Sequence, residues 1–352
     1  NSYRTVPLEQ SNVADYKAEP VVKNRNKPTW IGMLITGQNF VVEKNTLSYS
    51  IEPLIATVSY NTVEGVAINI SPGIYKYFSN RNELYISPNL RYGFNNSHLS
   101  AHITSTYTFG KRYENKIYFS GGRRVFQFNN YQPISPLGNT IWTLFFGNNY
   151  MKIYQADFFR IGYSEEFGHG LAAGILIDFQ NRFPLNNTTG YTWLNPDDKN
   201  FTPNFPTELT TINIPHHQAF TATLNFKWRP GTKYIQYPYR KINAGSRYPA
   251  FELAFTKGLR NVLYSDVEFA KWRLTVSDEV NLHLFGELRW KVYGGGFINN
   301  NRSFIPDFEF FNGNKSFGAS EYLNSFQLMP YYGFATTDNF FTAGHVEYHL
   351  NG

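Results

Sequence analysis

Long stretches of the chain alternate between apolar and polar residues with a period of two. Between residues 218 and 228, the apolar positions are Phe220, Ala222, Leu224, Phe226 and Trp228, and the residues between them are polar. Successive side chains of a β-strand point to opposite faces, so each such stretch predicts a strand with one apolar and one polar face. The stretches run for about 9–13 residues, which matches tilted strands that cross a bilayer better than the usual strand of about 5–6 residues.

We predict twelve strands of this kind and one more within residues 47–60. The twelve lie at residues 66–78, 83–94, 98–109, 116–128, 153–164, 171–182, 218–228, 249–257, 267–277, 281–293, 324–335 and 340–350. No helix is predicted, and apolar runs such as 171–177 are far shorter than the ~20 residues of a membrane-spanning helix. The sequence therefore indicates an all-β fold.

The connections between these strands differ in length in a regular way. Alternate connections are short, namely 79–82, 110–115, 165–170, 278–280 and 336–339, and those between them include the long 129–152, 183–217 and 294–323. Two connections break the pattern, because 229–248 is long and 95–97 is short. Short periplasmic turns at one end and long outer loops at the other are typical of outer-membrane barrels. We therefore expect an antiparallel, up-and-down transmembrane β-barrel in the outer membrane of a Gram-negative bacterium.

The two ends of the chain give further expectations. Residues 1–30 are polar and contain Pro7, Pro20 and Pro28, which predicts an extended periplasmic arm or linker before a barrel formed by residues 31–352. On the predicted path, the strand 340–350 runs outward. A closed bacterial barrel has an even number of strands and no free edge, so we expect roughly 14 strands or more, with a returning strand beyond this chain.

The composition excludes several classes of protein. Aromatic residues make up 18% of the 352 residues, charged residues make up 16%, and cysteine is absent. These values do not fit a disordered chain, a coiled coil or a disulfide-rich scaffold. The net charge of +6 is spread along the chain without a basic run, so nucleic acid is not an expected partner. Outer-membrane lipids are an expected partner, with basic residues at the rim facing their phosphates.

The sequence contains none of the catalytic or cofactor signatures that we sought. There is no Gly-x-Ser-x-Gly, no phosphate-binding glycine loop, no His-Glu-x-x-His and no dinucleotide fingerprint. Carboxylates such as Asp178, Glu252 and Glu268 alternate along strands as ordinary lumen or surface residues do. We therefore expect a non-enzymatic protein without a cofactor.

Aromatic residues recur near the ends of the predicted strands. Tyrosine and tryptophan form girdles at both interfaces of a membrane barrel, because they combine an apolar body with a polar tip. The candidates for such a girdle are Trp228, Trp290, Tyr331, Tyr332, Phe340 and Phe341. The alternative is a soluble β-protein that uses its aromatic residues in a core or to stack on sugars.

Two rows of polar residues are candidates for sites inside the barrel. Glu287, Arg289 and Lys291 alternate on one strand and are expected to pair with charges on adjacent strands, as lumen filling rather than as a selectivity site. His345, Glu347 and His349 alternate on the last strand, and their side chains suit zinc. Such residues are also ordinary lumen residues, so we expect no metal and keep these three only as weak candidates.

Three groups of segments resemble a known family. They include Glu-Gly-Val at 64–66 with Ile-Tyr-Lys-Tyr at 74–77, Arg-Lys-Ile-Asn at 240–243 with Tyr-Pro-Ala-Phe-Glu-Leu at 248–253, and Phe-Asn-Gly-Asn at 311–314 with Tyr-Leu-Asn-Ser-Phe-Gln-Leu at 322–328 and Pro-Tyr-Tyr at 330–332. Together they resemble the barrel half of Bacteroidota outer-membrane proteins that carry an N-terminal carboxypeptidase-regulatory-like domain. The resemblance implies an outer-membrane barrel and supplies no catalytic residues, since that domain has a binding or structural role. The upstream domain and the final strands of such proteins are not found in this sequence.

Three classes of function remain open. The first is a subunit of a larger outer-membrane complex whose partners are other outer-membrane proteins or lipoproteins, in outer-membrane protein biogenesis beside the barrel-assembly machinery or in surface export. The long, aromatic-rich loops and the lack of a catalytic set favour this class. The second is a channel or nutrient-import barrel, which conductance would reveal. The third is a surface glycan-binding β-protein, which would stay folded and soluble without detergent.

Overall fold

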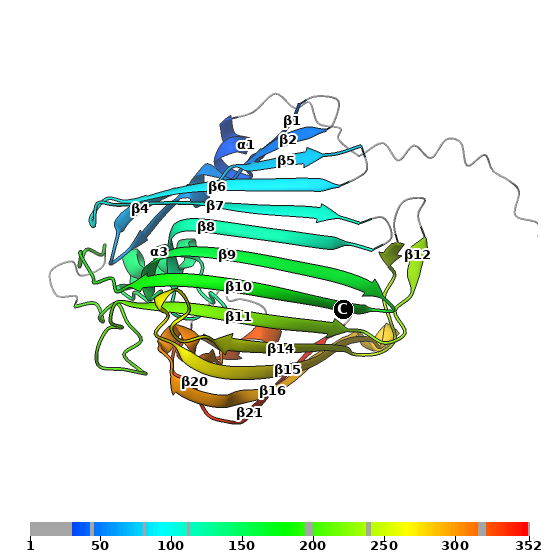
Figure 1. Cartoon of the computed structure of the whole chain (residues 1–352). Coiled ribbons are helices and arrows are strands. Elements are labelled where there is room, and N and C mark those ends of the chain that lie inside the picture. The colour runs from blue at the N-terminus through cyan, green and yellow to red at the C-terminus, as the bar shows by residue number, and fades with distance from the viewer. Residues whose placement is uncertain are drawn as a thin grey trace, which may run out of the picture.

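One large antiparallel β-sheet dominates the computed structural model, which describes residues 30–42, 46–79, 82–110, 113–193, 200–236, 241–315 and 322–350 (Figure 1). Within these residues the sheet has 15 strands. They are β1 (Gln38–Val42), β2 (Leu47–Ile51), β3 (Val58–Asn61), β4 (Gly65–Ile70), β5 (Gly73–Tyr77), β6 (Glu83–Gly93), β7 (His98–Phe109), β8 (Asn115–Gln127), β9 (Ile153–Gly168), β10 (Leu171–Phe183), β11 (His217–Trp228), β14 (Ala250–Gly258), β15 (Glu268–Asn281), β16 (Glu287–Arg302) and β21 (Phe341–His349). The expected all-β, antiparallel fold is confirmed.

From β5 onward, neighbouring strands of this sheet follow one another along the chain, as in a meander. The remaining strands form three small pairs: β12 (Tyr234–Gln236) with β13 (Lys241–Asn243), β17 (Glu309–Phe310) with β20 (Ala335–Thr336), and β18 (Gly313–Asn314) with β19 (Phe326–Gln327). Figure 1 shows the large sheet as a broad curved surface with β1 at one edge and β21 at the other. These two edge strands do not pair with each other in the part of the chain that the structure describes. The sheet is therefore open there, and a closed transmembrane barrel stays a prediction.

The connections sort to the two ends of the strands as the sequence indicated. The long connections 128–152, 184–216 and 303–340 all lie at one end, which we call the loop end, together with the shorter 94–97 and 259–267. The opposite end, the turn end, has the connections 78–82, 110–114, 169–170 and 282–286. The predicted exception is also confirmed, because the long connection 229–249 lies at the turn end and contains the β12–β13 hairpin.

Several predicted strands are correct, the one at 66–78 is divided into β4 and β5, and two are wrong. The strands expected at 83–94 and 98–109 are β6 and β7 almost to the residue. The strand expected at 281–293 instead starts after the turn at Gly286, whose φ of +107° suits glycine, and continues to Arg302. No strand spans 324–335, because this segment folds inward as part of the 303–340 connection and contributes only β19 and β20.

The loss of the 324–335 strand reverses the direction of the last strand. β21 pairs antiparallel with β16, so that Phe341 lies opposite Gly295 and His349 lies opposite Glu287. β21 therefore runs from the loop end to the turn end, whereas the sequence-based path had it running outward. That expectation is wrong. A further strand beyond β21 stays a prediction, and the direction of β21 no longer supports it.

The expectation that the chain has no helix is also wrong. The described helices are α1 (Trp30–Ile35), α2 (Leu54–Thr57), α3 (Pro136–Phe146) and the 3₁₀ turns η1 (Val262–Tyr264), η2 (His283–Phe285), η3 (Ile305–Asp307) and η4 (Tyr322–Asn324). Helix α3 has regular end signals: the Ser135 hydroxyl accepts a hydrogen bond from the Gly138 amide at 3.0 Å, proline follows at the first helical position, and Gly147 ends the helix at a φ of +62°. Among the described helices, none has the length and apolar character needed to cross a membrane.

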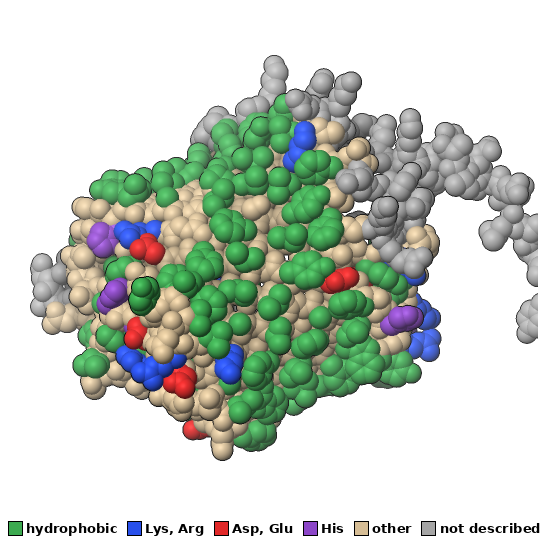
Figure 2. All heavy atoms as spheres, viewed as in Figure 1, with side chains coloured by type: hydrophobic (Ala, Val, Ile, Leu, Met, Phe, Trp, Pro, Cys, Tyr) green, Lys and Arg blue, Asp and Glu red, His purple; other side chains and the backbone are tan. Residues whose placement is uncertain are grey.

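The two faces of the sheet have opposite chemistry. On the face that we call the outer face, apolar rows cross the strands; Ile175 of β10, for example, lies between Tyr163 of β9 and Leu224 of β11, and all three are exposed. Figure 2 shows hydrophobic side chains spread over the outer face, with the charged ones mainly toward its ends. The other face, the inner face, carries polar residues such as Asp178 and Asn225.

The loop end of the inner face is filled by the long connections. They pack against the sheet in a buried cluster, which we call the loop core, formed by Val63, Phe126, Phe128, Ile134, Met151, Ile153, Tyr154, Ala156, Phe158, Leu185, Ile214, Ile305, Phe310, Tyr331 and Tyr332. Hydrogen bonds join different connections within it. The side-chain amide of Asn129 donates to Asn312 Oδ1 at 2.8 Å, and the backbone amide of Lys152 donates to the Tyr332 hydroxyl at 3.0 Å. The loop core closes this end of the inner face.

Candidate functional site

The two polar rows predicted from the sequence lie side by side on the inner face. In the register of β16 and β21, Glu287 is opposite His349, Arg289 is opposite Glu347 and Lys291 is opposite His345. The sequence placed each row on a strand but had no means to pair them, because the 303–340 connection separates the two strands. The expectation that these charges pair with an adjacent strand is confirmed for Arg289, whose Nε lies 3.4 Å from Glu279 Oε2 on β15.

The combined row is a set of partly exposed ion pairs. Arg289 also contacts Glu287, and His349 Nε2 lies 2.7 Å from Glu347 Oε1. Ion pairs this open to solvent contribute about 1 kcal/mol or less to stability. His345 stands apart from the other two candidate ligands and packs its ring 4.4 Å from that of Phe326. Nowhere in the described ranges do three or more His, Cys, Asp or Glu side chains form a group that could hold a metal ion.

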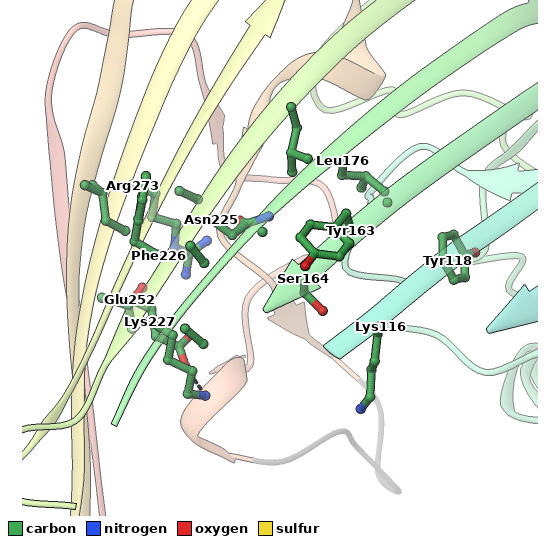
Figure 3. A pocket seen from close by; sticks show the side chains of 18 of the residues that line it. Lys116, Tyr118, Tyr163, Ser164, Leu176, Asn225, Phe226, Lys227, Glu252 and Arg273 are labelled. Atoms are coloured by element: carbon green, nitrogen blue, oxygen red, sulfur yellow. Dashed lines mark ion pairs between the residues drawn. The ribbon is translucent and has the colours of Figure 1, made fainter. Parts of the chain in front are cut away.

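A cavity of about 910 Å³ lies against the inner face, between the turn end and the loop core (Figure 3). Its wall extends from Lys116 of β8 and Lys227 of β11 to Arg273 of β15, and Tyr131 of the 128–152 connection also borders it. Figure 3 shows the ion pair between Lys227 and Glu252, whose Nζ and Oε1 atoms are 2.5 Å apart. The lining thus mixes apolar residues such as Leu176 and Phe226 with charged ones, and most of the charged ones are cations.

Two carboxylates fix the 303–340 connection to the wall of the sheet. Glu309 pairs with Arg273 of β15 at 2.5 Å and accepts a hydrogen bond from the Tyr131 hydroxyl at 2.8 Å. Asp307 Oδ1 lies 2.8 Å from Arg182 Nη1 of β10, and the side chains of this pair are only 5% and 2% exposed. These contacts hold the 303–340 connection in one position beside the cavity.

Lys152 is a buried cation among the connections that form the loop core. Its Nζ donates a hydrogen bond to Thr202 Oγ1 at 2.7 Å, and its side chain lies beneath the 184–216 connection. Burial lowers the pKa of Lys152 from 10.5 to about 8, and the nearby Glu208 opposes that shift only in part.

The stability of the protein is therefore expected to rise as the pH rises from about 8 to 9.5. In that interval the unfolded chain keeps the Lys152 proton that the folded chain has begun to release, so deprotonation favours folding. The free energy of unfolding, measured by urea denaturation across this interval, should rise in the wild type and be flat in Lys152→Met. Replacement of Lys257, which is exposed on β14, by methionine should leave the rise intact. An equal rise in Lys152→Met would contradict this origin.

Three of the six candidate girdle residues lie near strand ends and outside the loop core. Trp228 is exposed at the turn end of β11, Trp290 lies opposite Val346 on the outer face, and Phe340 is exposed at the loop end. Contact of these three with lipid stays a prediction.

The girdle prediction is wrong for the other three residues. Tyr331 and Tyr332 are buried in the loop core, and Phe341 faces inward, where its ring lies 5.3 Å from that of Phe311. Aromatic residues that stabilise packed loops give the same local sequence pattern as those that lie at an interface.

Sequence reasoning missed the residues that close the loop end. Asp307 and Glu309 lie in a connection without periodicity, and their partners Arg182 and Arg273 are more distant along the chain than any local pattern reaches. Helix α3 could have been found, because its Ser-Pro start and its terminal glycine are visible in the sequence.

Comparison with protein families places the chain in a known group. Residues 32–352 match the C-terminal domain of a family of unknown function, DUF5686. No curated protein matches the chain. The Bacteroidota origin and the carboxypeptidase-regulatory-like domain stay expectations from the sequence. Since the match covers nearly the whole chain, this protein belongs to the DUF5686 family.

Proposed function

We propose that the chain is part of a non-enzymatic outer-membrane β-barrel that acts as a subunit of a larger complex, in outer-membrane protein biogenesis beside the barrel-assembly machinery or in surface export. The membrane location is supported by the outer face, where exposed Ile, Leu, Val and aromatic residues continue from strand to strand. A monomer in water rarely exposes so wide an apolar surface. Lipid tails would cover it without the cost of hydrating it.

The sealed loop end supports a subunit role over free passage of solutes. The loop core and the Arg182–Asp307 and Arg273–Glu309 pairs hold three connections across the inner face. An open pore would instead need a water-filled path at this end. The connections thus form a fixed surface, which is what a stable protein interface requires.

The observation that carries the partner role is the orientation of α3. This helix buries the polar Asn139 and Thr143 and exposes the apolar Leu137, Ile141 and Phe145, which is the reverse of an ordinary surface helix. The exposed Trp193 extends the patch, with its ring edge-on to Phe145 at 4.5 Å. Apolar and aromatic residues on a rigid support are typical of the centre of a protein interface.

The test is purification of the full-length protein from native outer membranes in mild detergent, with every co-eluting protein quantified. We expect outer-membrane proteins or lipoproteins in a fixed ratio to the chain. Ile141→Asn should reduce the recovered partner by about tenfold, because an interface is centred on a few apolar contacts. Tyr248→Ser is the matched control, since Tyr248 is also an exposed apolar residue (58% against 42% for Ile141) but lies at the turn end. A solitary wild-type protein, or equal recovery with Ile141→Asn and with wild type, would contradict the proposal.

A channel or nutrient-import barrel is the second candidate, and the cavity of about 910 Å³ favours it. Its volume falls in the range of cavities that hold small molecules, roughly 300–1,000 Å³. Conductance in planar bilayers separates the two candidates: steady ion flow through the purified wild-type protein would support a channel, and a sealed protein would support the subunit role.

A further inference from the structure

A second cavity, separate from the one described above, lies on the inner face below the start of α3. It measures about 460 Å³. Its wall is built from β4, β6, β7 and β8, with Ser135 and Pro136 of the helix start on the other side. The polar lining includes Asn69, Asn89 and His102. We call this space the Arg124 cavity, after the cation on its wall.

Arg124 differs from the other arginines of the inner face. Each of these others is paired with a carboxylate: Arg91 with Glu64, Arg160 with Asp178, Arg182 with Asp307, Arg273 with Glu309, and Arg289 with Glu279. Arg124 has no acidic partner within the described part of the chain and packs its guanidinium 5.1 Å from the centre of the Phe126 ring. A guanidinium is always charged and offers several donors in one plane, which suits a carboxylate or a phosphate.

Two further polar groups of the same wall lack partners. The Nδ1 atom of His102 and the Oε1 atom of Gln127 are buried without a hydrogen bond, and both residues line the Arg124 cavity. Buried polar atoms in native proteins nearly always have a partner. Neither atom is accessible to water in this arrangement, so each would meet a ligand only after its side chain turned toward the cavity.

The start of α3 adds positive charge to the same cavity. The amino end of α3, which has 11 residues, borders the cavity at Ser135 and Pro136. Helix amino ends carry a partial positive charge that favours anions. Arg124 and α3 thus offer positive charge to one space, which Asn69 and Asn89 also line with polar groups.

We propose that the Arg124 cavity binds a small molecule that carries a carboxylate or phosphate group together with hydroxyl groups, such as a sugar acid or a sugar phosphate. The acidic group pairs with the Arg124 guanidinium near the amino end of α3, and the hydroxyls face the polar lining that includes Asn69 and Asn89. The volume of the cavity exceeds that of a bare ion, so there is room for the sugar part.

Isothermal titration of the full chain in neutral detergent tests this proposal with four probes: inorganic phosphate, glucose 6-phosphate, glucuronate and uncharged glucose. We expect one of the two charged sugars to bind more tightly than phosphate, and glucose not to bind. Arg124→Gln should weaken that binding by about tenfold or more, because it removes the charged donor. Lys227→Gln, in the larger cavity, is the control and should leave binding unchanged.

A second variant keeps the test valid if Arg124→Gln fails to fold. Asn89→Asp conserves size and places a carboxylate on the wall of the Arg124 cavity, so it should also prevent binding by repelling the anion. Absence of binding by every charged probe would overturn the proposal and leave a cavity that holds only water. Binding that survives both Arg124→Gln and Asn89→Asp would overturn it too, because the ligand would then sit elsewhere.

Discussion

Asp307→Ala is expected to lower the free energy of unfolding by about 3–5 kcal/mol, since it leaves a buried cation without its partner. The direct contacts left to Arg182 would be neutral: Gln180 Oε1, 2.9 Å from its Nε, and the rings of His217 and Tyr154. Asp307 Oδ2 also accepts the Phe304 amide at 3.0 Å, so the turn that begins the 303–340 connection would lose a bond as well. Urea denaturation of the purified protein in detergent, followed by tryptophan fluorescence, measures the loss.

The matched control is Glu252→Ala, which breaks an ion pair with Lys227 at a similar distance. That pair lies on the inner face, and its side chains are 62% and 47% exposed. Loss of an exposed pair costs about 1 kcal/mol or less. Equal destabilisation by the two variants would mean that the Arg182–Asp307 pair is open to solvent, in contradiction to the structure.

Leu224→Arg is expected to prevent stable insertion into the outer membrane. Leu224 lies in the middle of β11 on the outer face, between Ile175 of β10 and Phe255 of β14. An arginine on the lipid face near the bilayer midplane costs about 2–4 kcal/mol. The measurement is the fraction of the protein that stays with the membrane after extraction with alkaline carbonate, together with its unfolding in lipid vesicles.

Asn225→Arg is the control at the adjacent residue. Its side chain points to the inner face and lines the larger cavity, so the added charge meets water and should leave insertion unchanged. If the outer face met water, Leu224→Arg would be an ordinary surface substitution, with an effect within about 0.5 kcal/mol. Equal insertion of both variants would therefore contradict the membrane location.

The strands and their order along the sheet were predictable from the sequence because they depend on local periodicity. A period of two over 98–109 specifies both the strand and its two faces, and short connections then place neighbours side by side. The segment 324–335 shows where this fails. It contains aromatic residues at spacings that suit a strand, but Tyr331 and Tyr332 are buried by loops that no local pattern describes.

The candidate sites were less predictable because they depend on contacts between distant segments. The rows that contain Arg289 and Glu347 were each recognised, yet only the register of β16 and β21 shows that they form one surface. The Arg182–Asp307 pair and the unpaired Arg124 have no local signal, because a charge is buried, paired or unpaired only after the sheet and the loops have packed. A single sequence contains the residues of such a site but not their distances.

The loop core also determines when the protein can finish folding. Its members extend from Val63 to Tyr332, and they come from β8, β9, the turn between β3 and β4, and three long connections that join different pairs of strands. Contacts between such distant residues form slowly, because the entropy of closing long loops is lost before any packing is gained. The sheet must therefore pair first, and the connections seal its end last. Until then, the residues of the loop core are exposed in addition to the apolar rows of the outer face, which makes the partly folded chain prone to aggregation.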